Sequence, residues 1–76
     1  MTDYYHLIAR VVAGLHQNTA EARRIIYDAA RTSLLDEKRK AEPPLTESEI
    51  TRERLNLEQA IREVEAEELA RWVRKE

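Results

Sequence analysis

The only two prolines of this 76-residue chain are adjacent, at positions 43 and 44, and they limit what the chain can fold into. The proline ring clashes with the backbone of the residue before it and pushes that residue out of the helical region. A helix that approaches from the N-terminal side therefore has to end by about residue 41. The rest of the chain holds a single glycine, so this is the clearest break in an otherwise helix-forming sequence.

The segment that follows the prolines, LTESEI, carries several signals for the start of a new helix. Thr46 is placed as the N-cap, and Glu49, three residues later, as its partner in a capping box. Leu45 and Ile50 have the spacing of a hydrophobic staple. No helix-breaking residue occurs after this point, so we expect a rigid corner followed by one long helix over residues 47–75.

Two further helices are predicted before the corner from apolar residues at helical spacing. The first covers residues 3–16 and ends near Gly14; its stripe is Tyr4, Leu7, Ile8, Val11, Val12 and Leu15. The second covers residues 19–41, with Asn18 as its expected N-cap. Its expected buried stripe is Ala22, Ile25, Ile26, Ala29, Ala30, Ser33 and Leu34. The short link between these helices predicts an antiparallel hairpin.

The fold class that follows is all-α: a helical hairpin plus one long C-terminal helix, forming a three-helix bundle in one domain, residues 1–76. Hydrophobic residues make up 42% of the chain and aromatic residues only 5%, so the core is thin for this length. Chains this small often need oligomerisation to gain stability. We therefore expect the bundle to form a homodimer.

The long C-terminal helix is the expected site of this dimerisation, because it would outreach the shorter helices packed against it. Its apolar residues fall on two strips about 100° apart, which one hairpin does not require. The expected interface residues are Leu57, Ile61, Val64, Leu69, Trp72 and Val73. Two alternatives stay open: the first three residues belong to the chain's own core, or Trp72 rests on its own hairpin.

The residue types argue against catalysis, a cofactor or a metal site. There is no cysteine, and one glycine cannot make a phosphate-binding loop. His6 and His16 are too far apart along a helix to share a metal ion. The acidic residues lack the Glu-x-x-His pairs of di-iron bundles, so a solvated acidic face is the preferred interpretation. We expect a protein that is not an enzyme.

The basic residues provide the alternative function, a nucleic-acid-associated regulator. They gather on the predicted second helix as Arg23, Arg24, Arg31, Lys38, Arg39 and Lys40. The formal net charge of −2 and the interleaved acids argue against nucleic acid, because such binding depends on many cationic contacts to phosphate. An acidic protein partner or a membrane headgroup fits the same residues equally well.

Two stretches together resemble a known family segment: DYYHLIARVVAGLHQNTAEARRIIYDAARTSLL, and PPLTESEITRERLNLEQAIREVEAE after it. The chain resembles an N-terminal helical segment of uncharacterised rhizobial and related alphaproteobacterial proteins. Those relatives have Pro at the position of His6 and Gly at that of Ala20, which argues against a chemical role for His6. The resemblance implies a cytoplasmic module, often followed by a Pro/Arg-rich linker and a membrane-spanning helix. Neither is present in the 76 residues, so the resemblance leads us to expect either a stand-alone or a truncated copy.

The sequence therefore predicts a small cytoplasmic interaction module that self-associates and presents a charged surface to a protein partner. No apolar run approaches the roughly 18 residues needed to span a membrane, so we expect no membrane span in this chain. The identity of the partner does not follow from the residues.

Overall fold

The computed structural model describes residues 3–74 and contains three helices in that range. They are α1 (Tyr4–Ala13), α2 (Ala20–Lys40) and α3 (Glu47–Arg74), and no strand occurs among the described residues. The predicted all-α, three-helix class is confirmed.

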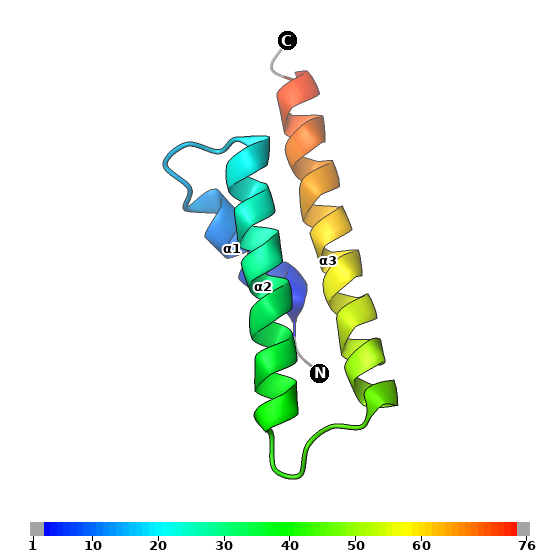
Figure 1. Cartoon of the computed structure of the whole chain (residues 1–76). Coiled ribbons are helices and arrows are strands. Elements are labelled where there is room, and N and C mark those ends of the chain that lie inside the picture. Colours follow the sequence, from blue (N-terminus) through cyan, green and yellow to red (C-terminus); the bar gives the residue numbers. More distant parts are fainter. Residues whose placement is uncertain (1–2, 75–76) are drawn as a thin grey trace.

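The two long helices, α2 and α3, run antiparallel and side by side, and α1 lies across the back of the pair (Figure 1). α1 contacts both long helices, and the chain leaves it through the loop 14–19. The molecule is elongated, with extents of 50 × 19 × 16 Å. One end of α3 projects beyond the beginning of α2 (Figure 1).

The proline corner forms as the sequence predicts. α2 ends at Lys40, and Ala41 is already extended, with φ −62° and ψ 150°. Across the corner, the Leu45 amide donates to the carbonyl oxygen of Lys38 at 3.5 Å. The capping box is complete: the Thr46 amide donates to Glu49 Oε1 at 2.9 Å, and the Glu49 amide to Thr46 Oγ1 at 3.1 Å.

The bounds of the first two helices differ from the prediction. α1 ends at Ala13 rather than at residue 16, so the link to α2 is longer and the antiparallel hairpin is less tight than expected. Asn18 as N-cap was wrong: Thr19 caps α2, and its Oγ1 accepts from the Ala22 amide at 3.1 Å. The Asn18 side chain instead bonds to groups of α2 and α3. The predicted last residue of the long helix, Lys75, lies outside the described residues.

All three helices contribute to one hydrophobic core. Its buried residues are Ile8, Val12, Tyr27, Leu34, Leu57, Ala60, Ile61 and Val64. Ile50 is buried as well, close to the proline corner.

The predicted apolar stripe of α2 is only partly buried: Leu34 is in the core and Ile26 and Ala30 pack against it, whereas Ile25, Ala29 and Ser33 are exposed. The helix turns Arg23, Tyr27 and Leu34 inward, whereas Ile25 is 70% exposed. At 100° per residue, the centre of the expected stripe lies about 100° away from the centre of the face that is buried. A large apolar surface of α2 is therefore left outside the core.

Candidate functional site

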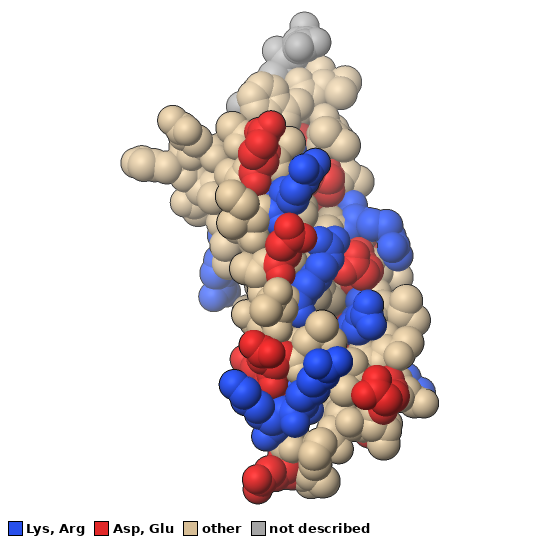
Figure 2. Space-filling model, in the orientation of Figure 1, with Lys and Arg blue, Asp and Glu red and all other residues tan. Residues whose placement is uncertain are grey.

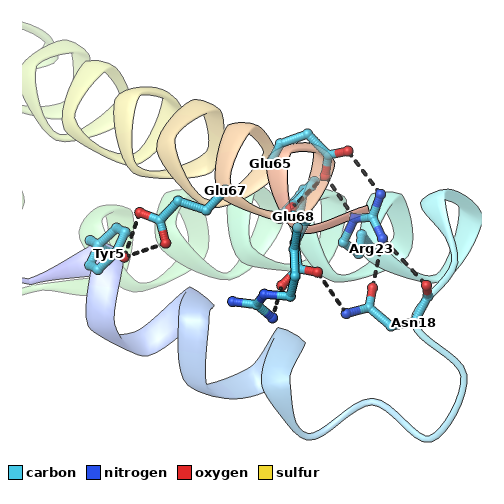
Figure 3. Close-up of polar contacts among 8 residues, drawn as sticks. Tyr5, Asn18, Arg23, Glu65, Glu67 and Glu68 are labelled. Carbon is cyan, nitrogen blue, oxygen red and sulfur yellow. Dashed lines mark hydrogen bonds and ion pairs between the residues drawn. The ribbon is translucent and has the colours of Figure 1, made fainter. Parts of the chain in front are cut away.

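Among the residues whose burial the structure describes, the most buried charged side chain is that of Arg23, which joins α2 to α3. Its guanidinium donates two hydrogen bonds to the Glu65 carboxylate, at 2.8 and 3.0 Å, and a third to Asn18 Oδ1 at 2.6 Å (Figure 3). The Arg23 side chain is 3% exposed and that of Glu65 is 32% exposed. Tyr27, one turn further along α2, donates its hydroxyl to the same carboxylate at 2.8 Å.

This arrangement holds each of its groups in one protonation state at neutral pH. The hydrogen bonds from Arg23 hold the pKa of Glu65 below its ordinary value, so the carboxylate stays ionised. Burial and the bond to Glu65 raise the pKa of Tyr27, so the phenol stays protonated. A general acid or base needs a pKa near the working pH. The cluster therefore fits a structural clamp rather than proton-transfer chemistry.

Two more polar contacts attach neighbouring parts of the bundle to α3, through Asn18 and Tyr5. The Asn18 amide nitrogen donates to the buried Glu68 at 3.1 Å, which also accepts from Arg71 at 3.2 Å (Figure 3). The Tyr5 hydroxyl donates to Glu67 at 2.7 Å (Figure 3). These contacts occupy acidic residues that the sequence analysis assigned to a solvated face.

A second arginine, Arg31, links the same two helices nearer the corner. It donates to both oxygens of Glu58, at 2.6 and 2.9 Å, and to Asp28 at 2.8 Å. The Arg31 and Glu58 side chains are 40% and 37% exposed. The two cross-helix arginine pairs have the same chemistry and differ mainly in burial.

The six basic residues offered for an anionic partner therefore do not form one free surface. Arg23 and Arg31 are paired within the chain. Arg24, Arg39 and Lys40 are exposed, and Lys38 is partly buried. Acidic and basic side chains alternate over this face (Figure 2), which does not favour a run of phosphate groups.

A shallow groove of about 490 Å³ lies between α2 and α3 on one side of the clamp. Arg24, Arg31 and Arg62 stand around it, and Ile61 and Leu69 give it an apolar part. Arg24 and Arg62 are exposed and form no ion pair within the described range 3–74. An acidic, partly apolar protein segment fits this combination.

The residues expected at a dimer interface separate into two groups. Leu57, Ile61 and Val64 are buried in the chain's own core, the alternative that the sequence left open. Leu69, Trp72 and Val73 are 54%, 56% and 75% exposed. More than half of Trp72 is therefore left uncovered by its own bundle.

The register of the two arginine pairs explains this exposure. Arg31 pairs with Glu58 and Arg23 with Glu65, so the start of α2 is level with Glu68 or Leu69. The α3 residues after that point have no α2 beside them. Trp72 and Val73 lie on this projecting end.

The two histidines lie at exposed positions of the described range. His6 is exposed and contacts Asp3, the N-cap of α1, whose pKa is lowered chiefly by that hydrogen bond. His16 is exposed in the loop 14–19. Among the described residues, no group of three or more His, Cys, Asp or Glu side chains is placed to hold a metal ion.

Comparisons with known proteins give no indication of function, so the function of this chain has to be argued from its structure. No family model, no curated protein and no solved structure matches this chain. Within the described residues, none of the helices combines the length and apolar character that crossing a bilayer requires.

Sequence reasoning missed the Arg23–Glu65–Tyr27 clamp altogether. A signal for it was present, because Arg23, Tyr27 and Leu34 share one face of α2 at helical spacing. A pattern search that accepts only apolar residues passes over a stripe whose centre is an arginine and a tyrosine.

Proposed function

We propose that this chain is a non-enzymatic helical module that self-associates through the projecting end of α3 and presents a charged surface to a protein partner. The contact between copies would use Leu69, Trp72 and Val73, which are more than half exposed. The partner would bind at the α2–α3 groove, where Arg24 and Arg62 are free to meet acidic side chains.

The observation that supports self-association most is the amount of surface that one copy exposes. A compact monomer of 8.9 kDa exposes about 4,800 Å². This chain exposes 6061 Å², roughly 1,200 Å² more than that. The radius of gyration, 14.0 Å, also exceeds the value of about 11.4 Å for a compact domain of this length.

Contacts between copies can bury an area comparable to this excess surface. One standard protein–protein interface covers about 800 Å² on each partner. Large apolar side chains that stay half exposed in the monomer supply the favourable free energy when a second copy covers them. Trp and Leu on a projecting helix end fit such a contact.

Light scattering and sedimentation across a concentration series test the proposal. We expect wild-type protein to contain more than one copy, and Leu69→Glu combined with Trp72→Ala to reduce its mass and melting temperature. Thr51→Glu is the matched control, since it adds the same charge at an exposed position far from this end of α3. A wild-type monomer at millimolar concentration would refute self-association.

A further inference from the structure

A second apolar surface lies on the other side of α2, where it meets α1. We call it the α1–α2 face and define it as Leu7, Val11, Ile25, Ile26, Ala29 and Ser33. Leu7 and Val11 are 54% and 53% exposed, and Ile25 is 70% exposed. A groove of about 300 Å³ runs between the two helices, lined by Leu7, Ile8, Val11, Ile26, Ala29, Ala30 and Ser33.

This face exists because the clamp turns α2 away from its own apolar stripe. Arg23 and Tyr27 point to α3 and bond to Glu65. At 100° per residue, Ile25 then lies on the opposite side of α2 from that buried face. The side chains at the groove are apolar except for Ser33, so water gains few hydrogen bonds there.

We propose that the α1–α2 face is a self-complementary docking surface for a second copy of this chain, with the two α2 helices antiparallel. The inference rests on the proposed self-association and adds a contact that the projecting end of α3 does not supply. The excess surface of roughly 1,200 Å² per copy is larger than the 800 Å² or so that one standard contact covers.

The order of residues along α2 fits this antiparallel pairing. A two-fold axis between Tyr27 and Asp28 places Ile26 opposite Ala29 of the other copy, and Ile25 flanks this central pair. Large side chains then face small ones in both directions, and small residues allow the helix axes to approach to about 8 Å. Because the contact is isologous, it closes without leaving a free surface.

The charges at the two ends of the paired α2 helices also favour this antiparallel contact. The same register brings Asp36 of one copy level with Thr19, the N-cap of α2, in the other copy. A carboxylate is favoured at a helix N-terminus, where unpaired backbone amides point outward. Both ends of the contact gain this arrangement, because the two copies are related by symmetry.

Two different isologous surfaces on one chain predict an assembly of four copies, a pair of pairs. The test measures the mass of wild-type protein and of variants in each surface by sedimentation equilibrium. Ile25→Glu is the variant of the α1–α2 face, and its high exposure in a single copy means that helix formation is unaffected. Leu69→Glu with Trp72→Ala is the variant of the α3 end, Thr51→Glu is the control, and far-UV circular dichroism checks folding.

We expect four copies for wild-type protein and for the control, two for each surface variant, and one for the combined variant. Ile25→Glu should weaken its own contact about 100-fold or more, since two isoleucines are lost from each symmetric contact. Wild-type mass in Ile25→Glu would overturn the inference. If the wild type is a dimer that only the α3 variant dissociates, the inference fails while the proposed function stands. A dimer dissociated only by Ile25→Glu would support the α1–α2 face and reject the α3 contact.

Discussion

Removing the carboxylate of Glu65 should destabilise this protein far more than removing the carboxylate of Glu58. Both residues lie on α3 and accept two hydrogen bonds from an arginine on α2. They differ in the arginine that loses its partner: Arg23 is 3% exposed, whereas Arg31 is 40% exposed. Glu65→Ala and Glu58→Ala therefore form a pair that differs in the burial of the arginine and in the Tyr27 hydroxyl, which also loses its acceptor in Glu65→Ala.

The expected loss in free energy of unfolding depends on which hydrogen-bond partners each arginine keeps after its glutamate is replaced. Arg31 can turn to water and to Asp28, so Glu58→Ala should lower the free energy of unfolding by at most about 1 kcal/mol. Arg23 keeps only Asn18 and stays buried, so Glu65→Ala should lower it by about 3 kcal/mol. The total free energy of unfolding of a chain of this length is about 4–11 kcal/mol. Glu65→Ala should thus remove a large share of the stability.

Urea unfolding, followed by circular dichroism at equal protein concentration, measures both changes. The concentration must be equal because any self-association adds to the apparent stability. Near 1 kcal/mol per molar urea, the midpoint should fall by about 3 M for Glu65→Ala and by 1 M or less for Glu58→Ala. Arg23→Met, added to Glu65→Ala, should recover part of the loss by removing the orphaned charge. Equal losses in the two single variants, or no recovery, would show that the burial of Arg23 does not set the cost.

Two further predictions concern pH and the proline corner. The pKa values of Glu65 and Glu58 lie below the ordinary 4.5 in the folded chain. The stabilisation that these two carboxylates provide is therefore complete above pH 4.5 and is lost as the pH falls through the lowered values. Melting curves should show this loss of stability below pH 4.5, and the loss should be smaller in Glu65→Ala. Thr46→Ala should cost about 1 kcal/mol, because the Glu49 amide loses its acceptor, and the melting temperature should fall by about 4–8 °C. An unchanged melting temperature in Thr46→Ala would show that the capping box does not stabilise α3.

The corner and α3 were predictable from sequence because their signals are local. Proline restricts its own neighbourhood, and the capping box joins two residues three positions apart. One predicted apolar strip of the long helix comprised Ile50, Leu57, Ile61, Val64 and Trp72; the first four are buried, whereas Trp72 is 56% exposed. Leu69 and Val73 belong to the second strip and are exposed, as a helix with two apolar strips requires.

The orientation of α2 was not predictable from its apolar residues alone, because it depends on a partner of Arg23 that is more than thirty positions away. The buried face of α2 includes Arg23 only because Glu65 lies opposite and forms two hydrogen bonds with it. Arginine can bury its aliphatic stem when its head is fully bonded. The same reason explains Asn18, which would cap α2 in isolation but bonds to Arg23 and Glu68 in the folded chain.

Some charged residues of this molecule are thus buried and some large apolar residues are exposed, which is the reverse of the usual distribution. Arg23 and Glu68 are buried, while seven large hydrophobic side chains of the described range are more than half exposed. In an isolated bundle this exchange is unfavourable: a buried ion pair seldom stabilises more than apolar residues do, and each exposed Leu or Ile forgoes about 1.5–3 kcal/mol. The arginine pairs do provide a fixed register between α2 and α3, which apolar side chains alone would allow to slide. Under the proposed self-association, the apolar residues exposed on α2 and on the projecting end of α3 become the contacts between copies, and the clamp, by fixing the orientation and register of α2, determines which surfaces the bundle offers.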